Sequence, residues 1–122
     1  MIGYVTLGTN DLKRAASFYD SLLGEIGARR MMDYDTLVMW AAKPGQPMVS
    51  VIKPYDGNAA TVGNGVMVAL AVDSKQKVDA LYAKAMELGG KCEGPPGARS
   101  DSFYAAYFRD LDGNKLNFFH TS

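Results

Sequence analysis

The predicted secondary-structure elements occur in the same order twice along the chain, and this repeat is the strongest restriction on its fold. In the first half, apolar residues at three- and four-residue spacing from Leu12 to Leu23 predict a helix, which Asn10 or Asp11 can cap and Gly24 can stop. The strands predicted around this helix span residues 2–8, 29–32, 36–42 and 47–53.

The second half repeats this order after the loop that ends near residue 65. Ser74 can cap a second helix, which contains Val78 and Leu81 and which Gly89 and Gly90 can end. The predicted strands of this half span residues 66–72, 91–93, 103–109 and 115–119.

The two halves align residue on residue. The aligned pairs are Tyr4 with Met67, Trp40 with Tyr107, and Ser50 with Asn117, and the last two pairs are both 67 positions apart. We therefore predict an α+β fold of two βαβββ modules, residues 1–55 and 63–122, within a single domain, residues 1–122. Two such modules can curl their sheets into a shared cup with the helices outside.

The composition agrees with one compact domain and excludes several classes of function. The chain has 122 residues, 48% of them hydrophobic, which is enough to bury a core without disulfides. Its 13 basic and 13 acidic residues balance and do not cluster, so we expect no nucleic-acid partner. No apolar run is long enough for a membrane span or a signal peptide, and the single cysteine, Cys92, fits a reducing cytoplasm.

Two motifs carry a resemblance to a known family. The opening "YVTLGTNDLKRAASFYDSLLG" and the closing "YAAYFRDLDGNKLNFF" resemble the two ends of the vicinal oxygen chelate superfamily, and the resemblance covers essentially the whole chain. This superfamily includes glyoxalase I, the bleomycin-resistance proteins, the fosfomycin-resistance enzymes and the extradiol dioxygenases. The resemblance implies paired βαβββ modules around a small-molecule site. In metal-dependent members it also implies His, Glu or Gln ligands on the first and fourth strands of each module.

This chain lacks those ligands at the matching positions, which are Tyr4, Ser50, Met67 and Asn117. Divalent first-row ions prefer imidazole and carboxylate, whereas a thioether suits Cu(I), and neutral amide or hydroxyl oxygens bind weakly on their own. We therefore expect no metal cofactor. The alternative is a divalent metal, as in the metal-dependent relatives, held by unexpected ligands.

Strand alternation predicts which other residues share the face of Tyr4, Ser50, Met67 and Asn117. The resemblance to fosfomycin-resistance enzymes implies that Tyr107 faces the cup, and Trp40 mirrors Tyr107 in the repeat. The predicted lining is aromatic and apolar, with a few hydroxyls and one amide, and suits a flat or apolar ligand. It consists of Tyr4, Val38, Trp40, Met48, Ser50, Met67, Phe103, Tyr107, Asn117 and Phe119.

Each of these residues also has a structural interpretation. Trp40 and Tyr107 can be ordinary core aromatics, and Asn117 can bond a neighbouring strand. Tyr4 can contact a ligand, but as a general acid it needs a neighbour to lower its pKa, and the sequence shows none.

The remaining candidates for chemistry favour structural roles. Strand alternation directs His120, the only histidine, toward the helix side or the chain end. No nearby base activates Cys92. Asp110 and Asp112 in "DLDGN" suit turn formation rather than catalysis. Arg99 lies in a Gly/Pro-rich loop, residues 94–102, that could act as a flap, and it either reaches an anionic ligand or faces solvent.

Three functional hypotheses remain open. The first is metal-free binding of a small aromatic or apolar molecule, as the resemblance to bleomycin-resistance proteins suggests. The second is a lyase or dioxygenase that uses unusual metal ligands or hydrogen bonds to a developing oxyanion, with no catalytic residue identified. The third is an interaction module with a filled cup. A homodimer is possible in each case.

Overall fold

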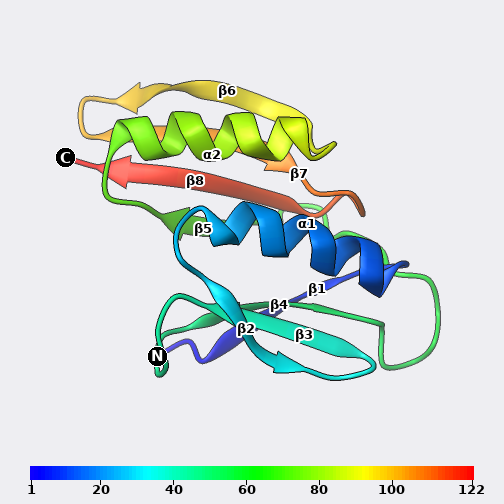
Figure 1. The fold of residues 1–122 in the computed structure, drawn as a ribbon. Helices are drawn as coiled ribbons and strands as arrows, with labels where there is room; N and C mark the ends of the chain where they lie inside the picture. Colours follow the sequence, from blue (N-terminus) through cyan, green and yellow to red (C-terminus); the bar gives the residue numbers. More distant parts are fainter. The chain divides into compact units, whose positions relative to one another are not determined.

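The structure, a computed structural model, describes residues 1–122, which divide into two compact units, Met1–Thr61 and Val62–Ser122. Both units have the order βαβββ, so the predicted α+β class and the repeat are confirmed (Figure 1). The first unit contains β1 (Tyr4–Gly8), α1 (Leu12–Gly24), β2 (Arg29–Asp33), β3 (Leu37–Ala41) and β4 (Met48–Ile52). The second contains β5 (Val68–Ala71), α2 (Lys75–Glu87), β6 (Lys91–Ser100), β7 (Phe103–Arg109) and β8 (Lys115–Thr121).

Each unit forms one four-stranded mixed sheet. The strand orders are β1-β4-β3-β2 and β5-β8-β7-β6. The first strand of each unit pairs with the fourth in parallel, and the other neighbours are antiparallel. The fourth strand therefore lies inside the sheet, between the first strand and the third.

Both helices begin where the sequence predicts a cap. The Asp11 carboxylate accepts a hydrogen bond from the Arg14 amide at 3.1 Å, and the Ser74 hydroxyl accepts one from the Lys77 amide at the same distance. These bonds satisfy amides that have no partner within the helix. After α2 the chain turns at Gly89, whose φ of +99° falls in the left-handed region that favours glycine.

One face of each sheet, called here the helix face, packs against the helix of its own unit. In the first unit Leu7, Val38 and Val51 lie opposite one another on this face, and all three are buried. In the second unit Phe108 and Phe118 are fully buried on the helix face, with ring centroids 5.5 Å apart. The other face of each sheet is called the helix-free face.

The prediction for residues 94–102 is wrong. Instead of a Gly/Pro-rich loop after a short strand, most of this segment continues β6 as far as Ser100, with three irregularities in its pairing to β7. Proline lacks a backbone donor and is tolerated on edge strands and at bulges. Because β6 is an edge strand, Pro95 and Pro96 do not end it.

Candidate functional site

The helix-free face of the second unit gathers several of the predicted lining residues. Asn117 on β8 lies between Tyr107 on β7 and Ala69 on β5. At one end of this face the rings of Phe103 and Phe119 stack, with centroids 5.4 Å apart and planes inclined at 22°. This face thus combines aromatic surface with one amide.

The Asn117 side chain is the unusual polar group of this face. Asn117 is only 1% exposed, yet its Oδ1 atom has no hydrogen-bond partner. A buried acceptor without a donor destabilises the folded state by about 1–3 kcal/mol, and most buried polar groups avoid this. The carbonyl oxygen is unpaired within the protein, but less than 1 Å² of it is exposed, so a ligand's donor reaches it only if the side chains that cover it move.

Met67 is the one predicted residue of the second unit that lies outside its strand. It directly precedes β5 and is 38% exposed. Strand alternation would put Met67 on the same face as Ala69 and Ala71, but the strand pairing begins only at Val68. The pairing of β5 with β8 therefore does not fix the position of the Met67 thioether.

In the first unit, the helix-free face carries Tyr4, Met48 and Ser50. Tyr4 is exposed at 57%, and Met48, its partner on β4, is half-buried. Ser50 is fully buried, and its hydroxyl donates a hydrogen bond to the Val5 carbonyl oxygen. That proton is already used within the sheet, so Ser50 can offer a ligand only its oxygen lone pairs.

The predicted orientation of Trp40 and Val38 is wrong. The strand register pairs Val38 with Val51 and Trp40 with Val49, which puts both side chains on the helix face. The Trp40 indole lies 5.7 Å from the Tyr19 ring of α1, measured between centroids. Trp40 is a core residue, and Met39 takes the position on the helix-free face opposite Ser50.

An α1 carboxylate holds the buried indole in place. Asp20 Oδ1 accepts hydrogen bonds from Trp40 Nε1 at 2.8 Å and from Arg30 Nε at 3.0 Å. The hydrogen bonds from Arg30 are the largest influence on Asp20 and, together with the Trp40 bond, hold the pKa of its carboxyl below the usual value. Arg30 also pairs with Asp33 at 2.8 Å. This network is structural, because it joins α1 to β2 and β3.

The four positions that would hold a family metal do not fit one. They offer a phenol, a hydroxyl already donating within the sheet, a thioether outside its strand and one neutral amide oxygen, from Tyr4, Ser50, Met67 and Asn117. None supplies the imidazole or carboxylate that such ions prefer. No cluster of three or more His, Cys, Asp or Glu side chains occurs elsewhere in the chain that could replace them.

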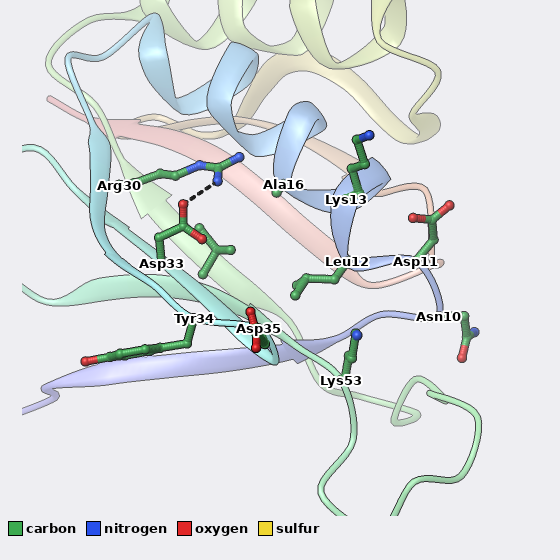
Figure 2. Close-up of a pocket in the computed structure, with 11 residues that line it drawn as sticks. Asn10, Asp11, Leu12, Lys13, Ala16, Arg30, Asp33, Tyr34, Asp35 and Lys53 are labelled. Atoms are coloured by element: carbon green, nitrogen blue, oxygen red, sulfur yellow. Dashed lines mark hydrogen bonds and ion pairs between the residues drawn. The ribbon is translucent and has the colours of Figure 1, made fainter.

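A separate cavity of about 510 Å³ lies in the first unit, beside the start of α1 and the β2–β3 turn (Figure 2). Of the predicted lining residues it contains only Val38, which is buried. Its walls are mostly charged and of mixed sign, and Figure 2 shows Arg30 already paired with Asp33. Ligand pockets are usually lined by apolar groups, so this cavity is a poorer candidate than the aromatic face.

The other sequence candidates have structural partners. Asp110 Oδ1 accepts hydrogen bonds from the amides of Asp112 and Asn114, both at 2.9 Å, which confirms the predicted turn chemistry. His120 Nδ1 lies 3.1 Å from the Val72 carbonyl oxygen. Cys92 is exposed, and its hydrogen bond with Tyr82 raises the pKa of that phenol.

Sequence reasoning missed Met39 and misplaced Trp40 for the same reason. A constant offset of 67 aligns Ser50 with Asn117 correctly, but the strand pairing makes Met39, not Trp40, the counterpart of Tyr107. The turn that follows β3 differs in length from the turn that follows β7, and this shifts the repeat by one residue. A shift of one residue moves a strand's side chains to the other face.

Comparison with known proteins agrees with this architecture. The sequence matches the family model described as the Glyoxalase/Bleomycin resistance protein/Dioxygenase superfamily over residues 1–118. No curated protein matches the sequence. None of the helices is long and apolar enough to cross a membrane.

Solved structures give the same fold. A glyoxalase/bleomycin resistance protein from Albidiferax ferrireducens T118 is 36% identical, with a TM-score of 0.91, and the match covers 100% of this chain and 99% of that chain. A hypothetical protein from S. aureus is 30% identical, with a TM-score of 0.76 and coverage of 98% and 92%. A lactoylglutathione lyase from Agrobacterium tumefaciens, 22% identical with a TM-score of 0.72 and coverage of 98% and 92%, is similar in fold.

Proposed function

The chain belongs to the Glyoxalase/Bleomycin resistance protein/Dioxygenase superfamily, and from that premise we propose that it binds a small aromatic or apolar molecule without a metal. The proposed contact surface is the helix-free face of the second unit. On the first unit, taken by itself, Tyr4, Met48 and Ser50 on the helix-free face are a separate candidate contact surface.

The observation that carries this proposal is the unpaired Oδ1 of Asn117. A ligand that donates a hydrogen bond to this oxygen would remove the penalty of a buried, unsatisfied acceptor. The half-buried rings of Tyr107 and Phe119 lie on the same face next to it. Phe119 is stacked on Phe103 and the Arg99 guanidinium lies over Tyr107, so a ligand would pack against the parts of both rings that stay exposed. A flat molecule with one hydrogen-bond donor satisfies both features.

The absence of metal in this proposal rests on the chemistry of the donor set. A site with one neutral amide oxygen and no charged ligand cannot compete with water for a divalent ion. The proposal therefore assigns Asn117 to ligand recognition, in place of the metal ligand that the resemblance implies at this position.

A thermal-shift screen of small aromatic compounds tests the proposal, because a ligand that binds only the folded state raises the melting temperature. We expect at least one compound with a hydrogen-bond donor to stabilise the protein. The affinity of that compound should fall by about two- to tenfold in Tyr107→Ala, since an aromatic contact contributes about 0.5–1.5 kcal/mol.

The matched control is Tyr104→Ala. Tyr104 is also half-buried on β7, but it lies on the helix face, where its hydroxyl donates to Asp79 at 2.6 Å. We expect Tyr104→Ala to lower stability and leave ligand affinity unchanged. Equal losses of affinity in both variants, or no stabilisation by any aromatic compound, would contradict the proposal.

A further inference from the structure

We propose that the ligand of this face is an aromatic carboxylate and that Arg99 binds its carboxylate group. This inference rests on the proposed function, since it names the chemical class of molecule that the helix-free face of the second unit would take. Four observations support it: the fixed position of Arg99, the glycines beside it, its free donors, and the distribution of charge around Tyr107.

The Arg99 guanidinium is held over the Tyr107 ring, with its central carbon 5.4 Å from the ring centroid. Its Nη1 donates to the Gly97 carbonyl oxygen at 2.8 Å, and its Nη2 donates to the Pro95 carbonyl oxygen at 2.7 Å. Both carbonyls belong to β6, the strand that carries Arg99. The exposed guanidinium is therefore positioned by its own strand and by the ring beneath it.

Two glycines of β6 make room for this arrangement. A Cβ at Gly94 would lie 3.2 Å from Arg99 Nη2 and 3.3 Å from Tyr107 Cδ1, and a Cβ at Gly97 would lie 3.1 Å from Arg99 Nη1. These distances are shorter than ordinary van der Waals contact. Glycine at both positions thus allows the guanidinium to lie flat against the strand, and Gly97 acts as a positioning residue.

Arg99 keeps donors for a ligand. A guanidinium has five N–H groups, and the two hydrogen bonds to β6 use only two of them. The planar arrangement of the remaining donors matches the two oxygens of a carboxylate, and such charge-assisted pairs are stronger than neutral hydrogen bonds.

The charges around Tyr107 favour an anion. Lys115 Nζ lies 5.6 Å from the centroid of the same ring. The nearby carboxylate, Glu93, is paired with Arg109 at 2.5 Å, and the pKa of Glu93 is lowered first by that hydrogen bond and further by the charge of Lys115. The hydrogen bonds of the Arg99 guanidinium go to backbone carbonyls and not to a carboxylate, so its charge, with that of Lys115 beside it, is available to an anionic ligand.

The aromatic part of the ligand follows from the positions along β8. Asn117 lies directly opposite Tyr107, and Phe119 lies two residues further along β8, about 7 Å away. A ring system between Asn117 and Phe119 would have its carboxylate within reach of the guanidinium over Tyr107. A hydroxyl or amino substituent on such a ring could donate to Asn117 Oδ1.

The test compares 2-naphthoate with its neutral counterpart, 2-naphthamide, by calorimetric titration of the full chain at low and high salt. We expect the wild-type protein to bind 2-naphthoate about tenfold more tightly than 2-naphthamide, which is the typical effect of one charge-assisted pair. Arg99→Gln should remove most of this preference, with only the weaker attraction of Lys115 left, and should leave the affinity for 2-naphthamide unchanged. The preference should also shrink at high salt, because Arg99 is exposed.

Two further variants distinguish the effect of the position of the Arg99 guanidinium from the effect of positive charge in general. Gly97→Ala keeps the charge of Arg99 but shifts its guanidinium by a few tenths of an ångström, so it should reduce the preference by less than Arg99→Gln does. Arg14→Gln removes an exposed cation from α1 and should have no effect. Melting temperatures of all variants confirm that they fold.

The outcomes distinguish this inference from the proposed function. If 2-naphthamide binds as tightly as 2-naphthoate, or if Arg99→Gln keeps the preference, the carboxylate inference is wrong while aromatic binding stands. If neither compound binds and the aromatic screen finds no ligand, both proposals are wrong.

Discussion

Asn114 and Asn117 are both buried in the second unit, but only Asn117 has a buried side-chain atom without a hydrogen-bond partner. Asn114 Nδ2 donates to Asp110 Oδ2 at 3.0 Å, whereas Asn117 Oδ1 has no partner. The first amide stabilises the turn before β8. The Asn117 amide does not stabilise the fold through Oδ1, and we therefore assign it to contact with a ligand.

This difference predicts opposite effects of the same substitution. Asn117→Leu should leave the ligand-free melting temperature unchanged or raise it, because an unsatisfied acceptor is replaced by an apolar group of similar size. Asn114→Leu should destabilise the protein by about 1–3 kcal/mol, because it removes the side-chain donor of Asp110 Oδ2 in a buried turn and leaves only the backbone amides on Oδ1. Chemical denaturation measures both, and a large loss of stability in Asn117→Leu would contradict our assignment.

Asp20 supports the fold of the first unit through Trp40. Asp20→Ala should lower the free energy of unfolding by about 1–2 kcal/mol at pH 7, because it leaves the buried indole N–H unpaired. Asp33→Ala is the control: it removes only a partly exposed ion pair with Arg30 and should cost under about 1 kcal/mol.

The pH dependence of the Asp20 effect follows from the direction of its pKa shift. A carboxyl whose pKa is lowered on folding stabilises the folded state above its unfolded pKa of about 3.9. This contribution is lost as the pH falls through the lower, folded pKa. The stability difference between wild type and Asp20→Ala should therefore shrink below about pH 4, and denaturation curves that stay equally separated there would contradict the assignment.

At the level of elements, the helices depend on signals within a few residues, while the strand faces depend on distant partners. The Ser74 cap and the "DLDGN" turn were predictable because each involves neighbours in sequence. The face of Trp40 depends on which residue of β4 lies opposite it. Aligning the two halves at a constant offset does not predict this pairing, because the connection between β3 and β4 is one residue longer than the one between β7 and β8.

The same reasoning explains the error in β6. Its prolines and glycines are typical of a loop, and only the pairing with β7 shows that they continue a strand. This strand assignment changes the interpretation of the Arg99 side chain. It is a positioned side chain on a strand instead of a mobile one on a flap.

The caps allow a test at the level of elements. Ser74→Ala should destabilise the protein by about 1 kcal/mol, because the Lys77 amide at the start of α2 loses its acceptor. Ser17→Ala, at an exposed position inside α1, should change stability by less than about 0.5 kcal/mol. Thermal or chemical denaturation compares the two, and equal effects would show that the cap contributes little.

At the level of the whole molecule, the donor set predicts that the protein does not depend on a metal. Protein purified without a histidine tag should contain only substoichiometric zinc, manganese, iron or nickel by elemental analysis. Neither a chelator nor added metal should shift its melting temperature, since a metal that bound the folded state would raise it. A stoichiometric metal whose removal lowers the melting temperature would contradict the metal-free proposal.

The sequence by itself determined the repeat, the order βαβββ in each unit, the helix caps, the turn before β8 and the unusual residues at the family's metal positions. These features follow from the periodicity and chemistry of residues close together in the chain. Only the tertiary structure decided that Trp40 belongs to the core, that Asn117 Oδ1 is unpaired, and that Arg99 lies over Tyr107. Each of these depends on strand register and on contacts between distant segments, and local patterns do not specify either one.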